Sequence, residues 1–270
     1  MNRGSAILLA FILFPAAVKE KKLDYEEVVK KVIAKNGTYL DSTDPMECGG
    51  VEPDEAARAR IIKHFKRVAG WPNFRAAHTM GTWGKSIPMC HVPTGKEQCH
   101  EMLRDNGVVF TPLSQAKGII NPVELESNIN GVKLACEEPL IVDCDFALAL
   151  HDMTKILAGM GVEKVNVLSL HRPESPHSFH ALGLGMDMNW FKLKEMSGNL
   201  YVKTRFEKRE KFKTCNYEPV TKKGKFLMDF ACRMWEEKLF NTILTPNYNP
   251  GHANHFHVDL RPGDNRFYLN

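Results

Sequence analysis

The chain has 270 residues, of which 43% are apolar and 25% are charged. It is therefore long enough to bury a sizeable core, and its composition excludes wholesale disorder. The formal net charge of +4 is mild, so it favours an anionic surface but does not select between cell wall and nucleic acid. Length and composition allow one generous domain or two small ones.

The first eighteen residues have the segments of a secretory signal peptide in the usual order. Asn2-Arg3 gives a short positive start, an apolar run extends from Ala6 to Phe14, and small residues at 15–18 precede a charged cluster at 19–22. The apolar run is shorter than the roughly 20 residues that span a bilayer. A buried N-terminal helix is the alternative, but the abrupt change to charged residues favours export. We expect a secreted or periplasmic protein from which residues 1–18 are removed.

Seven cysteines fit an oxidising compartment, where up to three disulfides would leave one thiol. Their connectivity does not follow from the sequence, and proximity alone suggests Cys90–Cys99 and Cys215–Cys232. The repeated pairs Cys90-His91 and Cys99-His100 would also suit a second metal. A disulfide flanked by two surface histidines is the plainer interpretation.

The region before residue 116 contains two predicted helices. The first covers Asp24–Lys35, and the second begins at Pro53 and continues through Phe65. Residues 36–52 have the composition of a loop, and residues 70–115 are irregular. We treat residues 19–115 as an N-terminal helical and irregular region of unknown role.

Clearer patterns begin at residue 116. Short strands at 123–125 and 132–135 are predicted around the turn Asn130-Gly131. Asp143 is expected to cap a helix that ends at Gly161, and a strand is expected at 165–170. A last helix is predicted at 225–240 and a last strand at 255–260.

A further strand is predicted where Met186, Met188 and Trp190 alternate with Asp187 and Asn189, because alternation gives one apolar and one polar face. Trp190, and Phe256 farther along, are interpreted as core packing rather than as sugar-stacking platforms. The basic stretch 203–213 is interrupted by acidic residues and is interpreted as a solvated hairpin, although a role as a substrate wall stays open. Strands and helices in this order predict an α+β domain with a central antiparallel sheet and packed helices.

Six histidines fall into two clusters. In a strand, residues two apart share a face, so His255 and His257 would point the same way. Two imidazoles and one carboxylate leave the fourth position of a tetrahedral zinc free for water, which distinguishes a catalytic site from a structural one. The H-E-x-x-H helix of many zinc peptidases is absent. The first cluster comprises His171, His177 and His180, followed by Asp187; the second comprises His252, His255 and His257.

Both clusters lie in recognisable motifs. The segment 178–187, SFHALGLGMD, resembles the S-x-H-x-x-G-x-A-x-D signature of D-Ala-D-Ala metallopeptidases, with Gly185 where alanine is usual. The segment 254–259, NHFHVD, is similar to their H-x-H strand. The histidine spacings at 177–180 and 252–257 are also similar to those of penicillin-insensitive murein endopeptidases.

The longer segment that contains both motifs, about residues 118–262, resembles the extensin-like C-terminal domain family. It includes Asn121-Pro122-Val123, Cys144 before the segment 147–149, and the segment 246–249 that leads into the second cluster. The resemblance implies that residues 116–270 form an extensin-like metallopeptidase domain with a zinc-peptidase fold like that of Hedgehog and DD-peptidases.

The resemblance also implies a role for each site residue. Zinc would be held by His180, Asp187 and His257. His255 would be the general base or would stabilise the transition state, and Arg172 would hold a substrate carbonyl or carboxylate. The residues expected to support the ligands or contact substrate are His177 and His252.

Asn254 departs from the pattern, because many D-Ala-D-Ala peptidases place a glutamate base at this position. An amide cannot take a proton from water, so the base would be His255, whose ordinary pKa near 6.5 suits proton transfer. The departure weakens any transfer of carboxypeptidase specificity.

These features predict a zinc-dependent hydrolase acting on peptidoglycan stem or cross-link peptides. No nucleic-acid partner and no membrane insertion after signal cleavage are expected. One alternative is a non-catalytic wall-binding or envelope-integrity protein with the same fold. Another is a secreted toxin or effector directed at the wall of another cell.

Overall fold

The computed structural model describes residues 39–41, 94–175, 178–208, 215, 218–261 and 266–270. The predicted signal segment, both N-terminal helices, Cys90 and His177 lie outside these residues. No helix within the described ranges is long and apolar enough to cross a membrane.

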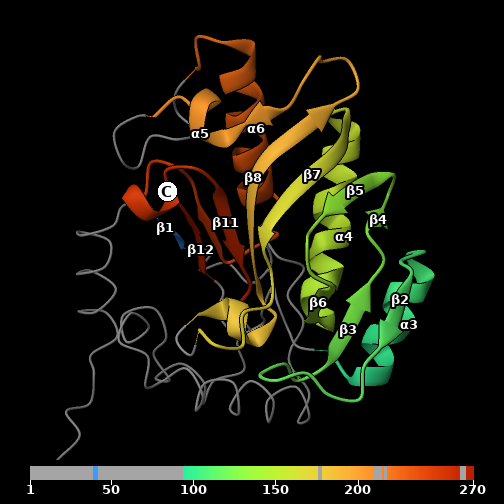
Figure 1. Cartoon of the computed structure of the whole chain (residues 1–270). Coiled ribbons are helices and arrows are strands. Elements are labelled where there is room, and N and C mark those ends of the chain that lie inside the picture. The colour runs from blue at the N-terminus through green and yellow to red at the C-terminus, as the bar shows by residue number, and fades with distance from the viewer. Residues whose placement is uncertain (1–38, 42–93, 176–177, 209–214, 216–217, 262–265) are drawn as a thin grey trace, which may run out of the picture.

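A large mixed sheet forms the centre of the fold, with strand order β1-β12-β10-β11-β8-β7-β5-β4 and with β9 paired to β8 (Figure 1). The α+β class is as predicted. The antiparallel prediction is right for β10, β11, β8 and β7 but wrong for the pairs β5–β7 and β10–β12, which are parallel. The chain between β5 and β7 contains a long helix, which gives it the length that a parallel crossover needs. The strands are β1 (Tyr39–Asp41), β4 (Asn128–Ile129), β5 (Val132–Ala135), β7 (Val162–Ser169), β8 (Gly185–Leu193), β9 (Leu200–Tyr201), β10 (Thr242–Leu244), β11 (Phe256–Asp259) and β12 (Arg266–Leu269).

A second sheet has the order β2-β3-β6, formed by β2 (Phe110–Pro112), β3 (Pro122–Leu125) and β6 (Leu140–Asp143). Both strands predicted around Asn130-Gly131 exist, but they do not pair with each other. β5 instead pairs with the two-residue β4, while β3 joins the second sheet. The turn itself is as expected: φ is 53° at Asn130 and 76° at Gly131, the left-handed backbone that tight hairpins require.

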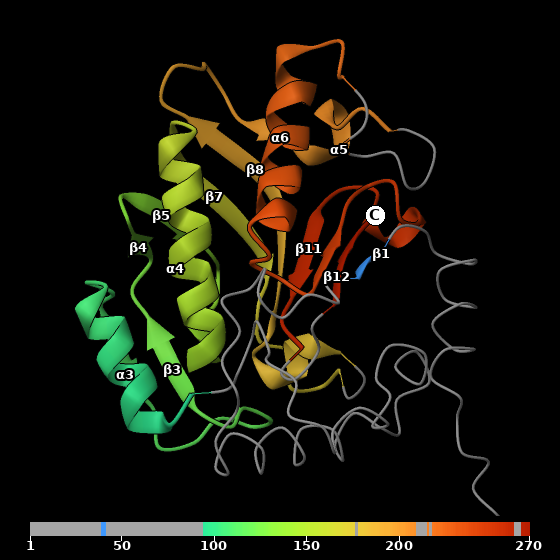
Figure 2. The same ribbon diagram turned by 180° about the vertical axis from the view of Figure 1, so that it is seen from behind.

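Two long helices, α4 (Cys144–Gly159) and α6 (Lys222–Glu236), cover one face of the large sheet (Figure 2). As predicted, the Asp143 side chain caps α4 by accepting a hydrogen bond from the backbone of Asp145. Thr221 caps α6 in the same way. The short helices are α5 (Val202–Arg205) and the 3-10 turns η3 (Phe179–Leu182) and η4 (Pro250–His252).

The core lies between this face and the two helices, and it includes Phe256 as predicted. Trp190, in contrast, is only half-buried, so the prediction that it packs in the core is wrong. The reason is a break in the register of β8 against β7 at Asn189, which interrupts the alternation of faces.

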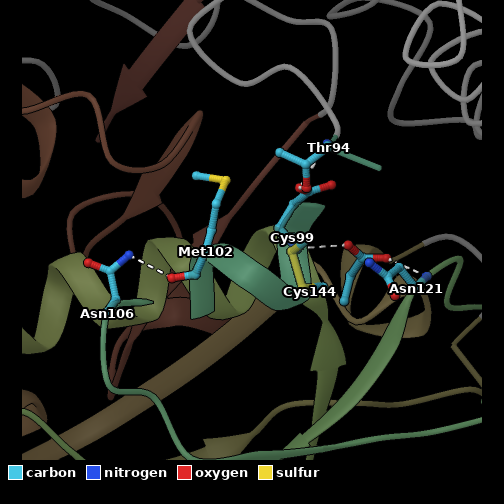
Figure 3. Close-up of a disulfide and its surroundings, with 8 residues drawn as sticks. Thr94, Cys99, Met102, Asn106, Asn121 and Cys144 are labelled. Carbon is cyan, nitrogen blue, oxygen red and sulfur yellow. Dashed lines mark hydrogen bonds between the residues drawn. A yellow bond between two sulfur atoms is a disulfide. The ribbon is translucent and has the colours of Figure 1, made fainter. Parts of the chain in front are cut away.

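Helix α3 (Lys96–Asp105) is joined to α4 by a disulfide between Cys99 and Cys144 (Figure 3). Beside it, the Thr94 hydroxyl donates to the Asp145 carboxylate at 2.7 Å. The pairing of Cys99 with Cys90 was therefore wrong, because the buried face of α3 presents Cys99 to the start of a helix 45 residues away in sequence. The second predicted disulfide, Cys215–Cys232, is present.

Candidate metal centre

The centre is built on two neighbouring antiparallel strands, β8 and β11. Asp187 lies directly opposite His257 in their register. Their neighbours Met186 and Val258 are fully buried in the core on the helix-covered side. Because side chains alternate along a strand, Asp187 and His257 are presented on the opposite side of the sheet.

The third side chain comes from the short turn η3. The Ser178 hydroxyl accepts a hydrogen bond from the backbone of His180 and starts the turn. The turn ends at Gly183, where φ is 66° and a Cβ would lie 2.6 Å from Ile119, so only glycine fits. At Gly185, a Cβ would lie 3.2 Å from the His180 nitrogen. This tight path returns the chain into β8 with His180 beside Asp187.

The three potential ligand atoms lie close together. Asp187 Oδ1 is 2.9 Å from His257 Nδ1 and 3.3 Å from His180 Nε2, and the two ring nitrogens are 3.2 Å apart. A tetrahedral zinc with ligands at about 2.1 Å would separate those ligands by roughly 3.4 Å. The described side chains thus form a group that could hold a metal ion, and its donor set of two imidazoles and one carboxylate is one that zinc accepts.

Each imidazole is held through its other nitrogen. His180 Nδ1 donates to the Leu170 carbonyl at 2.7 Å, and His257 Nε2 donates to Asp259 Oδ2 at 3.0 Å. Asp259 is in turn held by Arg261, whose Nε donates to Oδ1 at 2.9 Å. In the neutral form of each ring, these bonds leave the lone pair on the nitrogen that faces Asp187. Sequence analysis missed Asp259, although its place two residues after His257 on one strand face was a usable signal.

Charge is shared unequally among the three groups. Burial opposes ionisation of Asp187, but its contacts with the His180 and His257 rings outweigh burial and hold its pKa well below the ordinary range. Burial also opposes protonation of His257, yet its hydrogen bonds to Asp187 and Asp259 raise its pKa to about 9. The pKa of His180 is lowered, chiefly by burial. Near neutral pH the metal-free group therefore holds one carboxylate, one charged imidazole and one neutral imidazole.

His255, the predicted base, lies at the edge of this group with Nε2 3.6 Å from Asp187 Oδ1. Its Nδ1 donates to Asn254 Oδ1 at 2.8 Å, which leaves the lone pair on Nε2. Burial lowers the pKa of His255, and the charge of His257 adds to that effect, so the ring is neutral at pH 7.

Arg172 and His252 also lie at the centre. Arg172 follows β7 and places a guanidinium nitrogen 3.5 Å from Asp187 Oδ2, with 47% of its side chain exposed. The His252 ring lies 5.0 Å from that of His255, its Nδ1 bonds with Asn249, and burial together with the charge of His257 lowers its pKa to about 4. His171 instead bonds with the Lys117 carbonyl.

A mixed sheet with helices on one face and a His-Asp-His group on the other defines an α+β protein with a candidate metal centre. The sequence model of the family described as extensin-like protein C-terminus matches residues 97–268. The chain belongs to this extensin-like family. The matched range begins upstream of the resemblance seen in the motifs and includes α3 from its second residue onward, with its disulfide. No curated protein and no solved structure shows significant similarity to the chain.

Proposed function

We propose that the chain is an exported zinc-dependent hydrolase that cuts peptide bonds in peptidoglycan stem or cross-link peptides. The observation that carries this proposal is the convergence of His180, Asp187 and His257, with the far nitrogen of each ring hydrogen-bonded to an oxygen acceptor and the near nitrogen facing the centre. The order and spacing of the two motifs support a zinc-peptidase fold like that of Hedgehog and DD-peptidases.

Zinc bound by these three residues would act as a Lewis acid and bring the pKa of a water ligand to about 7. The burial of His180 and Asp187 supports this use, because a charged centre interacts more strongly where bulk water is excluded. The remaining residues would then manage protons and orient substrate.

His255 would take a proton from the attacking water at Nε2 and return it to the leaving amine. Its lowered pKa keeps the ring neutral and so available as a base near pH 7. Asn254 stands where the D-Ala-D-Ala peptidases that the motif resembles have a glutamate, and here its Oδ1 accepts a hydrogen bond from His255 Nδ1. The substitution therefore exchanges a carboxylate base for an oriented imidazole base.

Arg172 would stabilise the oxyanion that forms on the substrate carbonyl. Its guanidinium is held near the centre by Asp187 Oδ2. The guanidinium has further N–H groups that could donate hydrogen bonds to the oxyanion. His252 would line the site as a neutral ring, since its pKa is about 4.

The disulfides Cys99–Cys144 and Cys215–Cys232 support export, because such bonds persist in oxidising compartments. The choice of peptidoglycan rests on the motif resemblance and on the mild positive charge of the chain.

Digestion of purified wall sacculi tests the proposal. Wild type, Asp187→Asn and Asp229→Asn are compared by mass analysis of the released muropeptides. Asp229 makes the matched control because it is exposed on α6, where it pairs with Lys225. We expect wild type and Asp229→Asn to release the same fragments with new peptide termini, and Asp187→Asn to release at least about 100-fold less. Equal release by all three would contradict a catalytic role of the metal centre, whereas no new termini with zinc-loaded wild type would favour the non-catalytic wall-binding alternative.

A further inference from the structure

The sheet face that carries Asp187 continues along β8 past a β-bulge. Val167 of β7 pairs with Met188, but the preceding residue, Asn166, pairs with Trp190. Asn189 is therefore an extra residue on β8, and Asn166 Nδ2 donates to its side-chain oxygen at 2.8 Å.

The packing shows which way the bulged residues point. Met188 and Phe191 are both fully buried, and the Phe191 ring lies edge-on to Phe230 of α6 at 5.3 Å. Two residues separate them, so Asn189 and Trp190 both face away from the helices. The bulge thus moves Trp190 from the core side to the side that carries the candidate metal centre.

Other apolar side chains join Trp190 on this face. A second register shift, between Val167 and Ser169, leaves Leu168 as an extra residue that is 48% exposed. Tyr201 of β9 is paired with Trp190, its ring centre is 6.4 Å away, and the residue is 47% exposed. We call Trp190 and Tyr201 the aromatic strip, and Leu168 is an aliphatic side chain on the same face. Trp190 is three residues from Asp187, or about 10 Å along the strand.

Two lysines border the aromatic strip. Lys164 is the cross-strand partner of Lys192, and its ammonium lies 5.2 Å from the centre of the Trp190 ring. Like charges directly opposite each other destabilise a sheet, whereas a bound anion between them relieves the repulsion. The border of the strip is therefore complementary to a ligand that carries carboxylates.

We propose that the aromatic strip binds the sugar portion of a wall fragment whose carboxylate-bearing peptide extends to the metal centre, an inference that rests on the proposed function. The C–H face of a pyranose ring carries partial positive charge and packs on the negative face of an aromatic ring. A span of about 10 Å corresponds to about three residues of extended peptide, so a sugar on Trp190 and a peptide bond beside Asp187 can belong to one fragment.

Binding to two soluble probes tests this inference. One is a disaccharide-peptide from peptidoglycan, and the other is the same peptide without sugar; calorimetry measures the affinity of the full chain for each. We expect the disaccharide-peptide to bind wild type about tenfold more tightly than the free peptide, and this advantage to be lost in Trp190→Ala and Tyr201→Ala. Lys164→Gln with Lys192→Gln should weaken both probes, because they share the carboxylates.

Val109→Ala is the control, since Val109 is 56% exposed, directly precedes β2 of the second sheet and lies outside the strip. Thermal melts confirm folding of each variant, and Tyr201→Ala keeps the test valid if Trp190→Ala fails to fold. Equal affinity of wild type for the two probes, no detectable binding of the disaccharide-peptide, or unchanged binding by both aromatic variants would overturn the inference. Hydrolysis is scored separately, so a protein that binds sugar through Trp190 but cuts nothing would refute only the proposed function.

Discussion

Replacing Asp259 by asparagine should weaken zinc binding without touching a ligand. The Asp259 side chain is 3% exposed and accepts two hydrogen bonds, one on each oxygen, from His257 and Arg261. An amide offers only one oxygen, so the variant must place its NH2 group against one of these two donors.

Both orientations of that amide are unfavourable. With its oxygen toward His257, the NH2 faces the Arg261 donor, and losing this buried bond costs about 1–3 kcal/mol of folding free energy. With its NH2 toward His257, the ring must accept at Nε2 and carry its proton on Nδ1, the nitrogen that faces Asp187. Protonated Nδ1 cannot bind a metal.

We therefore expect Asp259→Asn to bind zinc about 10–100-fold more weakly than wild type, the usual effect of losing a group that orients a metal-bound histidine. A competition titration against a chromophoric chelator measures the two dissociation constants, with Asp229→Asn as a control for the same chemical change on an exposed helix surface. Equal zinc affinity of Asp259→Asn and wild type would refute the reasoning from the His257 tautomer.

Three further predictions address the base, the disulfide and the pH response. His255→Gln should retain zinc but lose about 10²–10⁴-fold in turnover of sacculi, because general-base catalysis contributes about that much; metal content and turnover are measured on the same sample, and loss of zinc along with activity would show that His255 is a ligand instead. Replacing both Cys99 and Cys144 by alanine should lower the free energy of unfolding by about 2–4 kcal/mol in a denaturant titration, given the 45-residue separation that the bond closes. Burial, aided by the charge of Lys96, lowers the pKa of His100, so below pH 6.5 the unfolded chain binds a proton there more readily than the folded chain. Wild type should thus lose stability between pH 7.5 and 5.5, and His100→Gln should lose less, as thermal unfolding at both pH values would reveal; equal slopes would exclude a contribution from His100.

The sequence predicted those features of the fold that depend on local patterns. The Asn130-Gly131 turn requires left-handed backbone, and the Asp143 cap satisfies the first amides of α4, so each is encoded within a few residues. The strand that follows the turn was also predicted, but its partner was not. The partner of β5 depends on which strands join the large sheet and which join the second sheet. No local sequence pattern specifies that assignment.

The candidate site was predicted as a set of residues, and the structure adds how they are held. Strand periodicity was enough to put His255 and His257 on one face. Asp259 and Asn254 were not expected to orient these rings, because a hydrogen bond between neighbouring side chains depends on rotamers that sequence periodicity does not specify. Trp190 was misplaced for a related reason: one extra residue in β8 reverses the face of every side chain beyond it.

Zinc content is the most direct test of the central claim, which is that three side chains from distant parts of the chain bind one ion. Purified wild type and the variants His180→Ala, Asp187→Ala and His257→Ala are dialysed against buffered zinc and analysed by elemental mass spectrometry. We predict one zinc per chain in wild type and loss of that zinc in each variant. The control is His171→Ala, because His171 bonds with the Lys117 carbonyl, and this variant should keep its zinc. Wild type without zinc, or full zinc occupancy in any of the three variants, would contradict the central claim.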